Sequence, residues 1–274
     1  MISIAKSTGG FMSELYNTYL SVAFELQKHL KRRRLLIVAA IAVLIPLFFY
    51  ISPPDNSSQF ASTSLGFINI LIAVAAAMFA GDAVSGEFEN KIALVSFPTP
   101  QSRLSIFVGK YVASLLATFM TIVLFYLTML AQISQLYSID ALPVELWQSL
   151  GIALIYATSA VSIVFFLSSV LKRSTSATIL GFVSLMMILP VISMVLSRAS
   201  VEPWFIVTYS AGLISNVVGE GAIIMEPGRG IMGPGRETVS SFEPALGTGI
   251  IIMLAYTVLG FISSMIFVNR KSVD

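Results

Sequence analysis

Six apolar stretches, each close to the length that crosses a bilayer, follow one another along the chain. The hydrocarbon core of a membrane takes a helix of about 20 apolar residues. The stretches are Leu35–Ile51, Ser64–Ala80, Tyr111–Ile133, Trp147–Leu171, Ser176–Leu196 and Leu246–Val268. They predict an all-α polytopic membrane protein with six transmembrane helices in a single domain, residues 1–274. Pro46 and Pro190 lie inside two of these spans and are expected to kink them.

A different period precedes the first span. Within residues 11–34, apolar residues recur every three or four positions and polar residues fill the opposite side. The segment ends in the basic run Lys31, Arg32, Arg33 and Arg34. This pattern predicts an amphipathic helix at the membrane interface, with its bases near lipid headgroups. A helix packed on a partner protein is the alternative.

The last segment between spans, residues 197–245, is long and divides into two parts. Residues 203–218 are apolar but too short to span comfortably, and they carry Trp204 and Tyr209. They predict short re-entrant or interfacial helices. A seventh span is the alternative, but it would place the two termini on opposite sides. The second part, residues 219–235, is rich in Gly and Pro and is expected to be irregular.

The basic residues indicate the orientation of the chain. Of the 16 Lys and Arg residues, 13 fall in the N-terminal segment, the loop 81–110, the pair Lys172-Arg173 and the C-terminal tail. Arg198, Arg229 and Arg236 fall in the alternate set of segments. Because basic residues accumulate on the cytoplasmic side, we expect a multi-pass protein of the cell membrane with both termini in the cytoplasm.

Composition narrows the function. The chain is 56% hydrophobic and 11% charged, with a mean hydropathy of +0.89, which excludes a soluble fold. It has no cysteine and one histidine, and the cores of its spans carry no charged residue. We therefore assign no catalytic or metal-binding residue, and we expect no nucleic-acid partner. Gly109-Lys110 is followed by Tyr111 rather than Ser or Thr, so it is not a nucleotide-binding loop.

The loop 81–110 stands out because it is polar between two apolar spans. It contains three acids, three bases and two prolines. A membrane protein with so polar an internal loop is expected to contact something soluble there. The alternative is a solvated loop that only follows the positive-inside rule.

The residue order in this loop resembles the loop between the second and third spans of ABC-2-type exporter permeases, the membrane subunits of ATP-binding-cassette transporters. The matching positions are Asp82, Gly86-Glu87, Glu89, the apolar run 92–95, Pro98, Arg103 and Gly109-Lys110. The layout of six spans, an amphipathic N-terminal helix and a long last outer loop is also similar. Asn90-Lys91 departs from the family, which often has Gly-Thr there.

The resemblance implies a permease subunit that binds separate cytoplasmic ATPase subunits and a second permease chain, identical or related. ATP and Mg would bind to the ATPase, and none of the chemistry would be in this chain. The substrate would be hydrophobic or amphipathic: a lipid, a peptide or a drug. The alternatives are a non-transporting scaffold or immunity subunit that recruits the ATPase, and a membrane-embedded enzyme.

A coupling helix from about Ser85 to Phe97 would seat in a groove of the ATPase. The residues expected to contact the ATPase are Ser85, Glu87, Phe88, Glu89, Lys91, Ile92, Leu94 and Arg103. Those expected at the inner interface with lipid are Lys31, Arg32, Arg33, Arg34 and Lys110.

Overall fold

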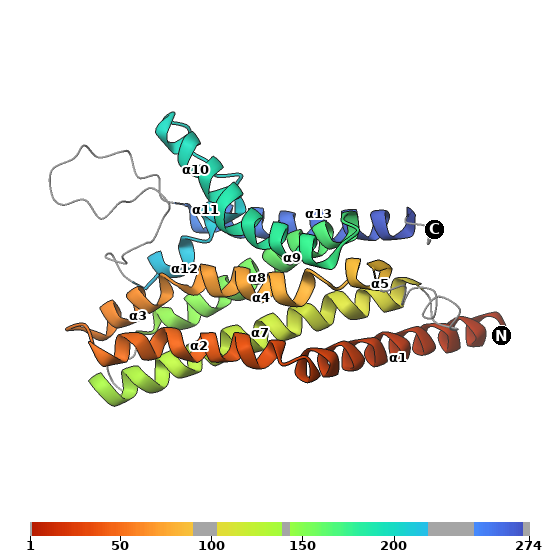
Figure 1. Ribbon diagram of the computed structural model, residues 1–274, viewed down its shortest axis with the longest axis horizontal. Coiled ribbons are helices and arrows are strands. Elements are labelled where there is room, and N and C mark those ends of the chain that lie inside the picture. The colour runs from red at the N-terminus through yellow and green to blue at the C-terminus, as the bar shows by residue number, and fades with distance from the viewer. Residues whose placement is uncertain (1, 90–102, 139–142, 219–243, 271–274) are drawn as a thin grey trace.

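The computed structural model describes residues 2–89, 103–138, 143–218 and 244–270, and its regular elements there are helices. Six helical segments in this part of the chain are long and apolar enough to cross a membrane, which confirms the prediction of six spans. Their bounds are Arg34–Ile51, Ser57–Glu89, Leu104–Tyr137, Glu145–Val170, Ser174–Arg198 and Leu246–Val268. The start of α1 and the end of α13 lie at the same end of the molecule (Figure 1).

The N-terminal helix α1 (Ile2–Lys31) is followed, after a short bend, by α2 (Arg34–Ile51). Both pack against α7 (Arg103–Tyr137) and follow each other along it (Figure 1). With 35 residues, α7 is about 52 Å long, whereas the hydrocarbon core is about 30 Å thick. One end of α7 therefore extends beyond the hydrocarbon region. The segment 11–34, predicted to be an amphipathic helix, is helical as far as Lys31, and the helix begins earlier, at Ile2. It packs on α7 and leaves Tyr16, Tyr19 and Phe24 exposed.

The second span starts earlier than the sequence indicated. The second span was predicted to begin at Ser64, but Ser57–Leu65 forms helix α3, which leads through a turn into α4 (Ile68–Ala80) and α5 (Ser85–Glu89). The hydroxyls of Ser62 and Thr63 donate hydrogen bonds to the carbonyl of Gln59, one turn back in the helix. Since these polar side chains are satisfied within their own helix, they can be part of a span.

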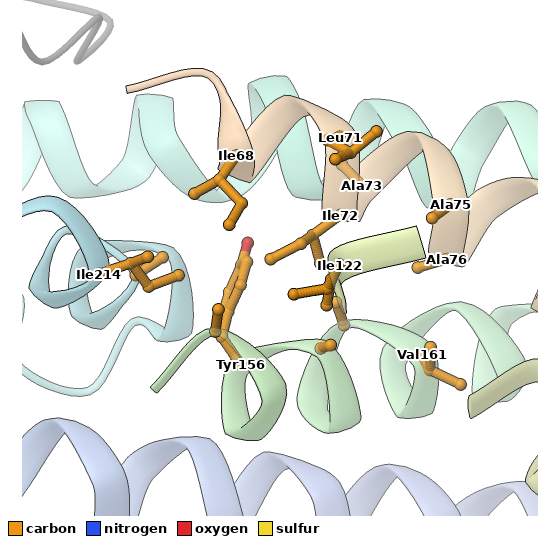
Figure 2. Packing of buried hydrophobic residues seen from close by; sticks show 14 of the residues in the cluster. Ile68, Leu71, Ile72, Ala73, Ala75, Ala76, Ile122, Tyr156, Val161 and Ile214 are labelled. Carbon is orange, nitrogen blue, oxygen red and sulfur yellow. The ribbon is translucent and has the colours of Figure 1, made fainter. Parts of the chain in front are cut away.

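Helix α8 (Glu145–Val170) lies at the centre of the bundle, in contact with α4, α7, α9 (Ser174–Val183) and α13 (Leu246–Arg270). The fully buried ring of Tyr156 on α8 lies beside Ile68 and Ile72 of α4 (Figure 2). Ile214 approaches the same ring from α12 (Leu213–Asn216), which follows the equally short α11 (Val207–Ser210). The apolar segment 203–218 thus forms short helices that reach into the core, not a seventh span.

The two prolines within spans are accommodated differently. A π-helical turn, η2 (Ser184–Ile188), precedes α10 (Leu189–Arg198), and Pro190 lies in the first turn of α10. The wider turn suits a residue that lacks an N–H and crowds the preceding carbonyls, and α10 turns away from α9 as predicted (Figure 1). At Pro46, the Gln132 amide of α7 can satisfy the helix backbone: in the orientation that satisfies both of its polar atoms, its nitrogen donates to the Pro46 carbonyl at 3.1 Å and its oxygen accepts from the Leu47 N–H at 3.3 Å.

Candidate functional site

Ionised side chains meet where the end of α1, the start of α2, the α4–α5 turn and the first part of α7 come together. The bend between α1 and α2 contains Arg33 in the left-handed conformation, with φ 58°. Arg32 and Arg34, on either side of it, both pair with Asp82 of the α4–α5 turn, at 3.3 Å and 2.6 Å. The Asp82 side chain is only 4% exposed. The bend is therefore held against the second span by one carboxylate.

A second ionic group is centred on Lys110 of α7. Its Nζ atom lies 2.9 Å from Oε1 of Glu87 on α5 and 3.4 Å from Oε2 of Glu25 on α1. Lys28 also pairs with Glu25. Burial opposes ionisation of Glu25, but Lys110 and Lys28 outweigh it and hold the pKa of Glu25 below its ordinary value. One lysine thus joins three helices that are far apart in sequence.

Lys110 was predicted to face the lipid interface, and the structure places it elsewhere. The residue is 5% exposed because carboxylates from two other helices surround its ammonium group. The basic run is also divided. Arg32 and Arg34 pair with Asp82, whereas the side chains of Lys31 and Arg33 are exposed.

His29 lies beside the two ionic groups and is fully buried. Its ring meets that of Phe79 edge to face, with centroids 5.1 Å apart, and its Nε2 is 4.0 Å from Oε1 of Glu25. Within the described residues, neither ring nitrogen has a hydrogen-bond partner. Burial lowers the pKa of His29 and outweighs the opposite influence of Glu25 and Asp82, so the imidazole is neutral near pH 7.

The residues predicted to contact an ATPase differ in burial within α5, where Ser85 and Glu87 are buried and Glu89 is exposed. The hydroxyl of Ser168 on α8 accepts hydrogen bonds from the Val84 and Ser85 N–H groups, both at 3.1 Å, and Ser85 is fully buried. Glu87 points inward to Lys110. Glu89 is exposed, and its Oε2 accepts a 2.7 Å hydrogen bond from the N–H of Ser174, the first residue of α9.

The other residues that were predicted to contact the ATPase lie in or after α5, and most of their side chains are outside the described part of the structure. Phe88 is half-buried. Arg103 begins α7, but its side chain lies outside the described part of the structure, as do residues 90–102 with Lys91, Ile92 and Leu94. Ser85 and Glu87 therefore fix α5 to the protein, and Glu89 is the predicted acid that faces outward.

Sequence reasoning missed Glu25 and Ser168. Glu25 lies three residues before Lys28 and four before His29, a spacing that indicates a pair within one helix. Nothing in the sequence indicates its second contact, with Lys110, 85 residues away. Ser168 is one of many hydroxyls in the spans, and its role at the start of α5 depends on how α8 packs.

A family model described as ABC-2 family transporter protein matches residues 17–203, more than half of the chain. The chain belongs to this family. A search of curated proteins returns no match. The matched range includes Glu25, Asp82, Glu87 and Lys110, so the ionic groups lie within the part that defines the family. As an ABC-2 family member, the chain is a membrane permease component of an ABC transporter.

Proposed function

We propose that this ABC-2 permease moves a hydrophobic or amphipathic substrate outward, driven by ATP hydrolysis in separate cytoplasmic ATPase subunits. Two permease chains would line the path between them. The segment that begins with α5 would receive the motion of the ATPase. The observation that carries this proposal is the pair of buried salt bridges that Lys110 forms with Glu87 on α5 and Glu25 on α1.

The geometry of these salt bridges supports a role of α5 in coupling to the ATPase. A short surface helix can transmit force only if it is fixed to longer elements, and α5 is fixed twice. Ser168 binds its first N–H groups, and Lys110 holds Glu87. Displacement of α5 would therefore move the first part of α7 and, through Glu25, the end of α1 as one body. Exposed Glu89 leaves one face of α5 available for a partner.

Site-specific cross-linking tests the contact with the ATPase. The chain has no cysteine, so a single introduced cysteine can carry a photo-cross-linker without background. In membranes that contain the cognate ABC ATPase, we expect Glu89→Cys to cross-link to the ATPase. Exposed Glu145, at the start of α8, provides the matched control. Glu145→Cys is expected to give no cross-link, since α8 begins at the other end of the bundle. Equal cross-linking at both positions would refute the proposed contact.

Reconstitution tests transport. Glu89→Gln keeps an acceptor for the Ser174 N–H but removes the charge, whereas Glu89→Lys removes the acceptor and reverses the charge. We expect ATP hydrolysis and substrate efflux to fall in Glu89→Lys and to persist in Glu89→Gln if the partner surface accepts a neutral group. A wild-type complex that hydrolyses ATP without moving any hydrophobic or amphipathic substrate would favour the non-transporting scaffold.

Thiol labelling tests the orientation. Lys172 lies in the short connection between α8 and α9, at the opposite end of α8 from Glu145, and both side chains are exposed. In intact cells, a membrane-impermeant maleimide is expected to label Glu145→Cys and to spare Lys172→Cys until the membrane is opened. The reverse pattern would place α5 outside the cell and exclude coupling to a cytoplasmic ATPase.

A further inference from the structure

A cleft of about 550 Å³ opens beside the ionic groups, between the second half of α1, the start of α2, the α4–α5 turn and the start of α9. Its volume falls in the range of about 300–1,000 Å³ that is typical of small-molecule sites. The inner wall is formed by buried Glu87 and Lys110, and the rim by exposed Phe24, Lys31 and Thr175.

The charges that line the cleft do not cancel. Five basic and four acidic side chains line it, which leaves one positive charge. Three of the acids pair with bases within the lining, and the fourth, Glu89, accepts the hydrogen bond from Ser174. Lys31 has no ion pair with any described residue, and the side chain of Arg32 is 48% exposed although it lies 3.3 Å from Asp82. The available positive charge is therefore at the rim, where it matches one singly charged anion.

The position of the cleft indicates which anion. Arg34, which lines it, is the first residue of the first span, so the cleft lies at the level where lipid headgroups meet the protein. Phe24 on the rim is 69% exposed and adds an apolar surface to the lining of the cleft. An apolar ring next to an unpaired base suits a molecule with an anionic group and an apolar body.

We propose that this cleft binds the phosphodiester headgroup of an anionic phospholipid, with Lys31 and Arg32 as its donors. A phosphodiester carries one negative charge, equal to the surplus of the lining. Phosphatidylglycerol keeps that charge, whereas the choline group of phosphatidylcholine cancels it. The site therefore discriminates between these two lipids. It differs from the diffuse attraction of a basic run to a charged surface, to which every exposed base contributes alike.

Native mass spectrometry of the full-length chain in detergent, titrated with each lipid, tests the site. We expect tighter binding of phosphatidylglycerol than of phosphatidylcholine. Lys31→Gln should weaken phosphatidylglycerol binding about tenfold, the size expected for the loss of one hydrogen bond to a charged group. Arg33→Gln is the matched control. Arg33 is exposed and two residues away, but it does not line the cleft. Its replacement should change the affinity by less than about twofold.

Three results would overturn the proposal. Equal weakening by Lys31→Gln and Arg33→Gln would show diffuse charge attraction. Equal affinity of the wild type for both lipids would show that the net charge of the headgroup does not determine binding. Displacement of phosphatidylglycerol by millimolar inorganic phosphate, in the wild type but not in Lys31→Gln, would show that the site recognises the phosphate group alone and that the rest of the lipid adds no affinity, which contradicts a site built for lipid. Retention of phosphatidylglycerol under inorganic phosphate supports the lipid.

Discussion

The ionic groups around Lys110 and the hydroxyl pairs inside the spans both join helices through buried polar atoms, but they differ in what remains when one partner is removed. In the spans, Tyr111 pairs with Ser162 at 2.7 Å and Thr158 with Thr257 at 2.9 Å. Ser162 and Thr257 also donate to carbonyls of their own helices. These hydroxyls therefore keep a partner without the interhelical contact. Among the described residues, Glu25 and Glu87 have no such alternative within their own helices when Lys110 is absent, apart from the pair of Glu25 with Lys28.

This difference indicates where a substitution is expected to cost little stability. Interhelical hydrogen bonds in membranes contribute about 0.6 kcal/mol on average, since the separated helices find other partners. A buried charge that loses its counter-charge costs about 3–5 kcal/mol. The ionic groups that join α1, α5 and α7 thus tolerate little change in a single partner, and the hydroxyl pairs tolerate more.

The largest effect is expected from Lys110→Met. The variant leaves two buried carboxylates without their common base, and we expect a loss of stability of about 3–5 kcal/mol, measured by thermal unfolding in detergent. The triple variant Glu25→Gln, Glu87→Gln, Lys110→Met is the control, because it removes the stranded charges together with the lysine. It should recover much of the loss. A single variant as stable as the wild type would show that the carboxylates are solvated rather than held by Lys110.

Gly109→Ala comes next, and it tests whether the ionic groups depend on close packing of α1 on α7. A Cβ atom at Gly109 would lie 2.5 Å from Cβ of Ser21 and 3.1 Å from the carbonyl oxygen of Thr18. We expect a cost of about 1–3 kcal/mol in the same unfolding measurement. Gly151→Ala on α8 is the matched control, with no atom within 4 Å of its added methyl group. It should be neutral or stabilising, since alanine favours a helix. Equal effects of the two substitutions would contradict the packing of α1 on α7.

Tyr126→Phe tests the hydroxyl side of the comparison. The Tyr126 hydroxyl pairs with that of Ser149 at 2.8 Å, and Ser149 also donates to the Ile214 carbonyl at 2.5 Å. Since Ser149 keeps this second contact, the expected loss is about 0.6 kcal/mol and at most about 1.7. A loss as large as that of Lys110→Met would mean that the hydroxyl pairs are not the more tolerant group.

The smallest effect is expected from pH. Burial lowers the pKa of His29 from its ordinary value of 6.5, so below pH 6.5 the unfolded chain takes up a proton before the folded one does. The contribution of neutral His29 to the free energy of unfolding is therefore fully present above pH 6.5 and decreases as the pH falls below that value. Lys28 and Arg34 act in the same direction as burial, and Glu25 and Asp82 oppose it. The melting temperature of the wild type should fall between about pH 7.5 and 5.5. It should fall less in His29→Phe, and equal falls would contradict a buried neutral imidazole.

Glu87 and Glu89 show how much of the site the sequence could predict. Both were predicted to contact a partner, and both lie in the short helix α5. Residues two apart on a helix point to nearly opposite sides, so the sequence implies that they cannot share a face. It does not indicate which of them faces inward. That depends on Lys110, which packing brings to within 2.9 Å of Glu87.

The membrane spans, in contrast, could be predicted largely from the sequence. Their number and approximate positions follow from apolar length, because an unpaired backbone group in the hydrocarbon is so costly that a long apolar segment must be helical. The start of the second span was misplaced, because the polar residues of 57–63 read as a connection. The hydroxyls of Ser62 and Thr63 donate to the Gln59 carbonyl of the same helix, a local effect that hydropathy does not report.

The sequence by itself determined the all-α class, the six spans, the amphipathic N-terminal helix and, through the residue order in 81–110, the resemblance to the ABC-2 family. These features depend on local composition and period, which a single chain carries in full. Only the tertiary structure decided that Lys110 lies between Glu25 and Glu87 and that Asp82 pairs with Arg32, 50 residues away. Many acids and bases lie near the ends of these spans, and Coulomb attraction does not depend on their order along the chain. Helix packing alone selects the pairs.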